Sequence, residues 1–257
     1  MIRVAAVGDV HVGPDSAGIV REQLATVRDR ADVLLLAGDL TKSGAPDEAE
    51  ALADVLQDVQ LDVVGVLGNH DHHSDQQHAV ARILRDAGVV ILEGDGTLIE
   101  TENGTVGIAG VKGFGGGFAG ASGSEFGEQE MKVFIRHTKE RADALEHALA
   151  ALDSDVRIAL MHYSPVRETL QGEPPEIFPF LGSYLLAEAI DRAGADLAIH
   201  GHAHRGREHG LTPGGVNVRN VAQTVIRQGY AVYEFETSSS RRRPVVGVTS
   251  TPAAAID

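Results

Sequence analysis

The sequence of 257 residues contains no cysteine and no tryptophan. The absence of cysteine excludes disulfide bonds, zinc sites with thiolate ligands and cysteine nucleophiles, and it fits a reducing compartment. No apolar run approaches the roughly 20 residues that cross a bilayer. The apolar start of the chain ends at Asp9 rather than at a small-residue cleavage site, so it predicts a first β-strand and not a signal peptide. We therefore expect a cytoplasmic protein with no membrane partner.

Basic residues are also scarce. The chain has 22 Lys and Arg against 37 Asp and Glu, which gives a formal net charge of −15. Such a chain repels the phosphates of a long nucleic acid, which makes DNA and RNA disfavoured partners. The aromatic residues, seven Phe and four Tyr, are too few to suggest a groove that stacks bases. Bound divalent cations would reverse the potential wherever acidic residues cluster.

Hydrophobic residues make up 43% of the chain and charged residues 23%, as in ordinary soluble globular proteins. In the first ninety residues, apolar strand-like runs alternate with helix-like segments, a pattern typical of βαβ units. Asn103-Gly104 between two apolar runs predicts a hairpin. The predicted strands cover residues 2–7, 33–37, 63–67, 89–92, 97–100, 106–109, 156–161, 197–199, 216–221 and 230–235. The predicted helices cover residues 16–30, 47–57, 75–87, 128–152 and 184–193.

No repeat and no clear linker divides the chain. We expect one domain over residues 1–236, followed by a C-terminal tail, residues 237–257, that is only partly ordered. Residues 113–127 are rich in glycine and predict a flexible loop, with the role of a flap over a nearby site as one interpretation. Residues 163–182 contain four prolines and predict a long loop that shapes a pocket.

Five apolar, strand-like runs each end in residues that bind metal ions. In open α/β sheets, ligands bind just beyond the carboxyl ends of the strands. Alternate residues of an extended chain point the same way. Asp9 and His11 are two positions apart, as are His202 and His204, so each pair can face one ion. A single Gly-Asp after a strand usually marks a turn, and a single loop histidine is usually solvated. The complete ordered set is what indicates a metal site: Asp9 and His11; Asp39; Asn69, His70 and Asp71; His162; His202 and His204.

These motifs, with their glycines at positions 8, 38, 68 and 201, resemble the motif set of the calcineurin-like metallophosphoesterases over residues 8–204. The resemblance implies an α/β fold, a four-layer α/β/β/α sandwich with two mixed β-sheets. The overall pattern resembles that of the small bacterial phosphodiesterase-like members, including the cyclic-nucleotide phosphodiesterase group. Asp71 stands where the Ser/Thr protein phosphatases have Glu, which argues against protein phosphatase activity. Lys42 stands where many relatives have a second acidic residue.

The resemblance also implies a dinuclear metal site with Asp39 as the bridging carboxylate. Mixed oxygen and imidazole ligands without thiolate suit Mn²⁺, which we expect first, and also Fe or Zn²⁺. The implied ligands of one ion are Asp9, His11, Asp39 and His204, and those of the other are Asp39, Asn69, His162 and His202.

The expected reaction follows from this arrangement of charges. Two metal ions roughly 3.5–4 Å apart share a water molecule and lower its pKa, which gives a bridging hydroxide for in-line attack on phosphorus. His70 is expected to protonate the leaving alkoxide, and Asp71 to orient the imidazole of His70. The predicted function is the hydrolysis of small phosphodiesters, in preference to phosphomonoesters.

Other functions remain open at this point. A nuclease-type phosphodiesterase would keep the same ligands, and so would a catalytically silent metal-dependent binding protein of this fold. A dinucleotide-binding oxidoreductase is discounted, because the glycine run over residues 113–117 lacks the required fingerprint. His72 and His73 are predicted on a surface loop after the site, where substrate contact is the alternative to plain solvation. The physiological substrate, the native metal pair and the oligomeric state are left open.

Overall fold

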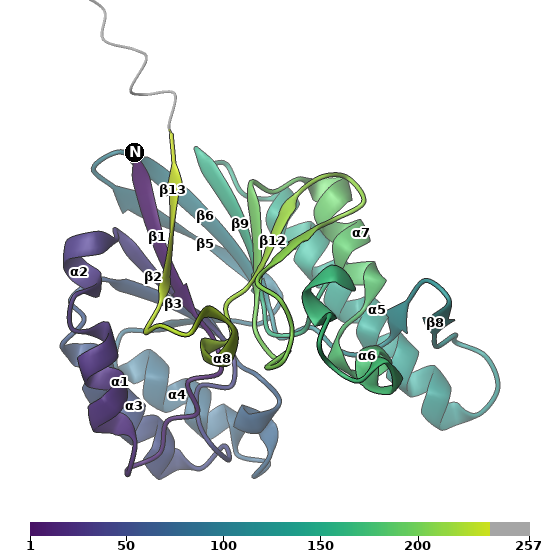
Figure 1. Ribbon diagram of the computed structural model, residues 1–257, viewed down its shortest axis with the longest axis horizontal. Coiled ribbons are helices and arrows are strands. Elements are labelled where there is room, and N and C mark those ends of the chain that lie inside the picture. Colours follow the sequence, from purple (N-terminus) through teal and green to yellow (C-terminus); the bar gives the residue numbers. More distant parts are fainter. Residues whose placement is uncertain (237–257) are drawn as a thin grey trace, which may run out of the picture.

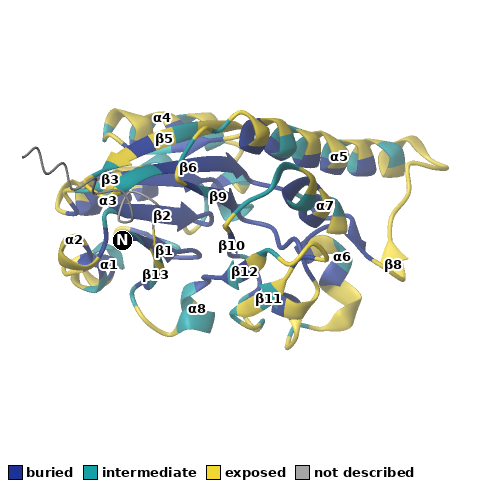
Figure 2. Ribbon diagram, turned by 90° about the horizontal axis from the view of Figure 1, so that it is seen from above, coloured by how far each residue is buried: buried dark blue, intermediate teal, exposed yellow. Residues whose placement is uncertain are grey.

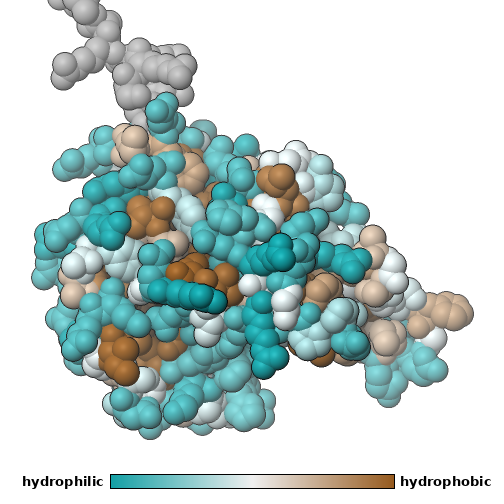
Figure 3. Space-filling model, viewed as in Figure 1, coloured by the Kyte–Doolittle hydropathy of each residue, from teal (hydrophilic) through white to brown (hydrophobic). Residues whose placement is uncertain are grey.

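The structure is a computed structural model that describes residues 1–236, in which two β-sheets pack face to face between two layers of helices (Figure 1). The predicted four-layer α/β/β/α arrangement with two mixed sheets is confirmed. The predicted tail, residues 237–257, lies outside the described residues. Within residues 1–236, no helix is both long and apolar enough to span a membrane. The molecular face in Figure 3 is mostly hydrophilic, with separate hydrophobic areas.

The first sheet has the strand order β13-β1-β2-β3-β4. Its strands β1 to β4 are parallel, and β13 joins β1 in the antiparallel direction. The strands are β1 (Ile2–Val7), β2 (Val33–Ala37), β3 (Asp62–Val66), β4 (Val90–Leu92) and β13 (Ala231–Phe235). The helices of this half are α1 (Ala17–Leu24), α2 (Val27–Arg30), α3 (Pro46–Gln57) and α4 (Gln77–Asp86).

The second sheet has the strand order β11-β12-β10-β9-β6-β5. Its central strands are parallel, whereas both edges are antiparallel hairpins. The predicted hairpin at Asn103-Gly104 is confirmed, because Thr101 pairs with Gly104. The strands are β5 (Asp95–Thr101), β6 (Gly104–Val111), β9 (Val156–Met161), β10 (Leu197–His200), β11 (His209–Leu211) and β12 (Asn217–Asn220). The helices α5 (Gln129–Ala150) and α7 (Tyr184–Ala193) pack together on its outer face (Figure 2).

Alternation along the strands explains why both faces of each sheet are buried. In β2, Leu34 and Leu36 pack toward the helices, while Val33 and Leu35 pack between the sheets. Successive side chains of a strand point to opposite faces, so a continuous apolar run fills two layers at once. The result is a rigid double sheet whose strand ends can hold polar side chains in fixed positions.

The short elements differ most from the sequence prediction. The single helix predicted over residues 16–30 is wrong, because α1 ends at Leu24 and α2 begins at Val27. The glycine-rich segment carries a two-stranded sheet, and its Gly116 N–H donates to the carbonyl of Pro179 at 2.7 Å. The elements that the prediction missed are β7 (Gly117–Phe118), β8 (Ala121–Ser122), β11, α6 (Phe178–Leu181), α8 (Gln223–Ile226) and 3₁₀ turns at His70–His72, Glu168–Leu170 and Pro175–Ile177.

Candidate metal centre

The predicted metal ligands all follow the carboxyl ends of strands, and both sheets contribute. β1 leads to Asp9 and His11, β2 to Asp39, β3 to Asn69, β9 to His162, and β10 to His202 and His204. Hydrogen bonds join the two sheets at this edge. The backbone N–H of His202 donates to the Asp9 carboxylate at 3.0 Å, and Nδ1 of His162 lies 2.9 Å from the carbonyl oxygen of Ala37. Residues from distant parts of the chain therefore meet at one place.

Four of the predicted ligands have a backbone conformation that residues other than glycine avoid. Their φ angles are +58° at Asp9, +42° at His11, +50° at Asp39 and +69° at His202. Only seven non-glycine residues in the part of the chain that the structure describes have positive φ, so more than half of them are predicted ligands. Strained residues persist where the surrounding structure fixes them, and they cluster at functional sites.

The first group of donor atoms belongs to Asp9, His11, Asp39 and His204, whose ligand atoms lie within 4.8 Å of one another. Nε2 of His204 lies 2.9 Å from Oδ1 of Asp9, and Nε2 of His11 lies 3.9 Å from Oδ2 of Asp39. Nε2 of His11 is buried and has no hydrogen-bond partner among residues 1–236. A buried polar atom without a partner costs free energy, and a metal ion at this position would remove that cost.

The second group of donor atoms belongs to Asp39, His162 and His202, again within 4.8 Å. Nε2 of His162 lies 3.3 Å from Oδ1 of Asp39 and 2.9 Å from Oδ1 of Asn69. The Ala37 carbonyl holds the other nitrogen of His162 and thereby directs Nε2 into the group. The structure thus brings Asn69 to the same place as the three charged or imidazole donors, and Asp39 belongs to both groups.

The ionisation behaviour of these residues suits metal ions. Asp9 and Asp39 are 4% and 1% exposed. Burial raises the pKa of Asp9 to about 6, against the hydrogen bond from His204. Burial lowers the pKa of His202 to about 3 and that of His162 well below its usual value, so both imidazoles are held in the neutral form that binds metals. Two buried carboxylates and several imidazole nitrogens, with no thiolate, form a donor set for divalent metal ions such as Mn²⁺, Fe²⁺ or Zn²⁺.

Glycines let the backbone approach the two carboxylates closely. A Cβ atom at Gly68 would overlap Oδ1 of Asp39, and one at Gly201 would overlap Oδ2 of Asp9. Any residue with a Cβ atom at either position would clash with the carboxylate. The two glycines are therefore required by the positions of the carboxylates.

His70 lies beside the donor atoms but outside both groups. Its ring centroid is 4.5 Å from that of His11, and its Nε2 lies 4.0 Å from Oδ2 of Asp39. Nδ1 of His70 lies 2.8 Å from the carbonyl oxygen of Lys42. A carbonyl only accepts, so Nδ1 carries the hydrogen and Nε2 faces the centre. The side chain is 45% exposed, which leaves it accessible to a ligand.

Asp71 does not make the predicted contact with the imidazole of His70. Its carboxylate accepts hydrogen bonds from the backbone N–H groups of Leu40, Thr41 and Gly68 at 3.1, 2.8 and 2.7 Å. The carbonyl of Lys42 instead occupies the position next to Nδ1 of His70. Asp71 is fully buried and ties the turn after β2 to the turn after β3. Although Asp71 is adjacent to His70 in the sequence, its carboxylate therefore contacts these turns and not the imidazole of His70.

Two further residues beside the centre were missed by the sequence reasoning. The ring of Tyr163 lies 4.4 Å from that of His202, and the backbone of Lys112 accepts a hydrogen bond from the N–H of His162 at 3.1 Å. Lys112 follows an apolar strand in the same way as the predicted ligands do. That position was the signal for it, but a cation is not a metal ligand.

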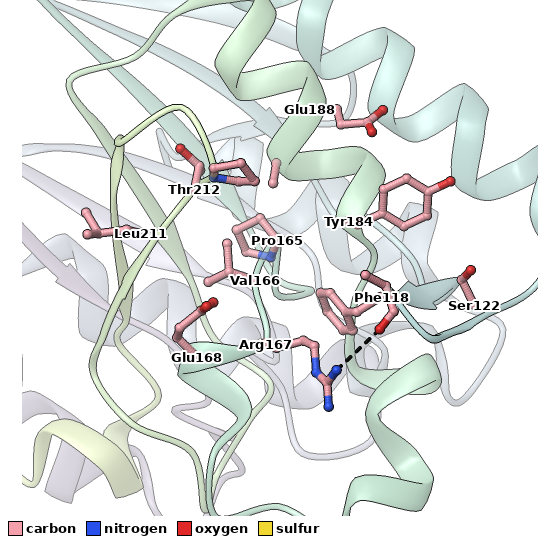
Figure 4. A pocket seen from close by; sticks show the side chains of 13 residues that line it. Phe118, Ser122, Pro165, Val166, Arg167, Glu168, Tyr184, Glu188, Leu211 and Thr212 are labelled. Atoms are coloured by element: carbon pink, nitrogen blue, oxygen red, sulfur yellow. Dashed lines mark hydrogen bonds between the residues drawn. The ribbon is translucent and has the colours of Figure 1, made fainter.

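A cavity lies away from this centre, between α7, β11 and the loop after β9 (Figure 4). Its volume is about 650 Å³, and the loop supplies Pro165, Val166 and Arg167. The guanidinium of Arg167 donates to the carbonyl of Ala119 at 3.3 Å. None of the predicted metal ligands lines this cavity, so it is not the metal centre.

Comparison with known proteins gives the family. The model of the calcineurin-like phosphoesterases matches residues 2–206, and the chain belongs to this family. The family uses dinuclear metal sites, and its members are hydrolases. A search of curated protein sequences gave no match.

Solved structures with the same fold come from several organisms. A phosphopantetheinyl hydrolase from Mycobacterium tuberculosis has a TM-score of 0.66 at 19% identity, over 99% of this chain and 98% of that one. The protein TT1561 from Thermus thermophilus has a TM-score of 0.55 at 17% identity, over 86% and 89% of the two chains. GAP50, the anchor in the inner membrane complex of Plasmodium, has a TM-score of 0.52 at 13% identity, over 87% and 72%. At these identities the likeness concerns the fold.

Proposed function

We propose that this protein hydrolyses small phosphodiesters with two metal ions held at the strand ends. The observation that carries the proposal is the pair of donor groups that share Asp39. Mn²⁺ is the first choice of metal, with Fe or Zn²⁺ as alternatives. The proposed ligands are Asp9, His11, Asp39 and His204 for one ion, and Asp39, Asn69, His162 and His202 for the other.

The chemistry that such a pair of cations supplies is the activation of water near neutral pH and the neutralisation of charge on phosphoryl oxygens. The protein residues hold the arrangement. Asp39 receives a hydrogen bond from the backbone N–H of His70 at 2.8 Å, and Asp71 fastens the two turns that carry Asp39 and Asn69. The Ala37 carbonyl fixes the ring of His162. These contacts keep the donor atoms in place without reorganisation during the reaction.

His70 is the proposed proton donor to the leaving alkoxide. The carbonyl of Lys42 accepts from Nδ1 of His70, so the protonated ring presents Nε2–H toward the centre. This nitrogen is close to Asp39 but is not in either donor group. Proton transfer by a positioned histidine contributes typically about 10²- to 10⁴-fold to a rate.

Phosphodiesters are proposed before monoesters because the motif set resembles that of the small bacterial phosphodiesterase-like members. Protein phosphatase activity is disfavoured, because the motif around Asn69 has Asp71 where the Ser/Thr protein phosphatases have Glu. The structural neighbour from Mycobacterium tuberculosis is named a phosphopantetheinyl hydrolase and matches nearly the whole of both chains. A phosphopantetheinyl ester is therefore included among the substrates to be tested.

The experiment is a panel of substrates assayed with Mn²⁺ and again after chelation. It compares bis-p-nitrophenyl phosphate, p-nitrophenyl phosphate, cyclic nucleotides, a phosphopantetheinyl ester and single-stranded DNA. We expect hydrolysis of the diesters to exceed that of the monoester, to stop on chelation and to return with Mn²⁺. Faster hydrolysis of DNA than of every small ester would favour the nuclease alternative. Inactivity with every metal, together with measured metal uptake, would favour the binding-protein alternative.

A further inference from the structure

A second cavity lies beside the candidate metal centre, between α4 and α5, which run along the same side of the molecule in Figure 2. Its volume is about 390 Å³. Leu67 and His72, which line it, bracket the turn that carries Asn69 and His70. Lys112, a third lining residue, accepts the hydrogen bond from the N–H of His162. The cavity therefore lies next to the metal centre, because its lining residues flank Asn69 in the chain and contact the backbone of His162.

The lining of this cavity has a charge opposite to that of the whole chain. Lys112, Arg141 and Arg85 contribute three cationic groups, and Glu93 is the one carboxylate. The formal net charge of the chain is −15. Cationic residues gathered in a concave site raise the local concentration of anions. The position of this cluster next to a phosphoesterase centre favours an anionic ligand.

Polar atoms without partners point to the same conclusion. Three buried side-chain polar atoms among residues 1–236 have no hydrogen-bond partner: Nε2 of His11 at the metal centre, Oε1 of Gln77 and Nε of Arg141. Gln77 and Arg141 both line this cavity. A phosphate group has oxygens that accept from Nε of Arg141, and its monoprotonated form has a hydroxyl that donates to Oε1 of Gln77.

Lys112 is a buried cation with no acidic side chain in contact with its ammonium. The residue is 8% exposed, and within the described residues its Nζ makes no ion pair. Nζ instead lies over the rings of Phe114 and Tyr163, at 5.1 and 5.6 Å from their centroids. An anion near Nζ would compensate the loss of water around the charge.

Glu93 and three histidines, His72, His78 and His137, also line the cavity. The carboxylate of Glu93 accepts from Nη1 of Arg141 at 3.0 Å and from the backbone N–H of Lys112 at 3.2 Å, which positions both cationic residues. Burial lowers the pKa of His72 to about 4 and also lowers that of His137. The two rings are therefore neutral near pH 7 and offer N–H donors without further charge.

We propose that this cavity binds a second phosphate group of the substrate, separate from the ester that is hydrolysed. The inference rests on the proposed function and extends it, since the substrate class becomes phosphodiesters that carry an additional phosphate. Tyr163 links the two sites, because its ring centroid lies 5.6 Å from Nζ of Lys112 and 4.4 Å from the ring centroid of His202. One substrate molecule would reach from the metal centre into the cavity past Tyr163.

The kinetic test compares alkyl 4-nitrophenyl phosphodiesters with and without a terminal phosphate, with short, intermediate and long alkyl linkers, on the Mn²⁺-loaded protein. For at least one linker we expect kcat/KM to be about tenfold higher with the terminal phosphate, because a hydrogen bond to a charged group changes a binding constant by about this factor. Arg141→Gln should bring the ratio close to one. Arg136→Gln is the matched control, because Arg136 is an exposed residue of the same helix paired with Glu125. Its ratio should equal that of the wild type.

A second measurement distinguishes a substrate phosphate from free phosphate. Inorganic phosphate is titrated into the metal-loaded wild type and Arg141→Gln while Tm is recorded, and Arg141→Lys replaces Arg141→Gln if the latter does not fold. An Arg141-dependent rise in Tm together with an ester ratio near one would show that the cavity binds free phosphate and would overturn the substrate assignment. If no ester is hydrolysed with any metal, the proposed function fails. In that case an Arg141-dependent rise in Tm still supports a phosphate site in the cavity. The absence of such a rise overturns the phosphate site.

Discussion

The carboxylate of Asp71 accepts two hydrogen bonds from Thr41, one from the backbone N–H at 2.8 Å and one from the hydroxyl at 2.5 Å. These two residues lie in different motifs, one after β2 and the other after β3. The contact therefore fixes the distance between the turns that present Asp39 and Asn69. We infer that Asp71 is a positioning residue of the candidate centre, whereas the carbonyl of Lys42 holds the ring of His70.

Asp71→Asn tests this role. We expect the free energy of unfolding to fall by about 2 kcal/mol, because an amide NH₂ would face buried N–H donors in place of an accepting oxygen. Denaturant unfolding measures the change. Asp75→Asn is the control, since Asp75 is exposed and its positive φ of 56° is tolerated by Asn. Unchanged stability with a large loss of kcat would instead assign Asp71 a direct role in the reaction.

Replacement of His70 should separate catalysis from metal binding. We expect His70→Gln to lower kcat by about 10²-fold or more, because a proton donor is lost, while the metal content stays unchanged. Kinetics on bis-p-nitrophenyl phosphate and elemental analysis of the same samples provide the two readouts. His147→Gln, an exposed position on α5, should change neither. Metal loss in proportion to activity loss would place His70 among the ligands and contradict the proposal.

Two glycines provide a matched pair of substitutions. Gly68→Ala should weaken metal binding more than tenfold and lower stability by about 1–3 kcal/mol, because its Cβ would overlap Asp39. Gly18→Ala should raise the free energy of unfolding by about 0.5–1 kcal/mol, since Gly18 lies in α1 and its Cβ would meet no atom within 4 Å. Metal titrations and denaturant unfolding check both. Normal metal affinity in Gly68→Ala would show that the turn relaxes easily.

The start of α3 predicts a pH dependence of stability. The carboxylate of Glu48 is buried, which opposes ionisation, but hydrogen bonds from Ser43 and Ala45 outweigh burial and lower its pKa below the ordinary 4.5. A depressed folded-state pKa stabilises the protein above the unfolded value and loses that contribution as pH falls below it. We expect the stability difference between wild type and Glu48→Gln, about 1 kcal/mol at pH 7, to shrink as the pH falls below 4.5. A difference that stays constant down to the acid transition would contradict this assignment.

Much of the centre could be predicted from the sequence because its residues follow buried strands. The apolar run of β2 ends at Ala37, and Gly38-Asp39 follows directly, so the strand end and the carboxylate are adjacent in the chain. His162 likewise directly follows the end of β9, and Asn69 lies three positions after the end of β3. Local patterns of this kind place the residues at one edge of a sheet, and the family resemblance joins them into two ligand sets.

The partners of those residues could not be predicted, because they come from distant segments. Nδ1 of His162 meets the carbonyl of Ala37, 125 positions earlier, and backbone carbonyls leave no trace in a sequence. The cationic cavity likewise forms where Lys112 at the end of β6 meets Arg141 on α5 and Gln77 on α4. No spacing rule connects these three residues. Helix packing on the sheet brings them together.

The measurement that tests the central claim most directly is the metal content of the wild type and of Asp39→Asn after equilibrium dialysis against Mn²⁺, together with phosphodiesterase activity. His11→Ala serves as the comparison, because His11 belongs to one donor group and Asp39 to both. The account predicts about two ions per chain and activity in the wild type, close to none of either in Asp39→Asn, and about one ion in His11→Ala. Full metal content or full activity in Asp39→Asn would contradict it.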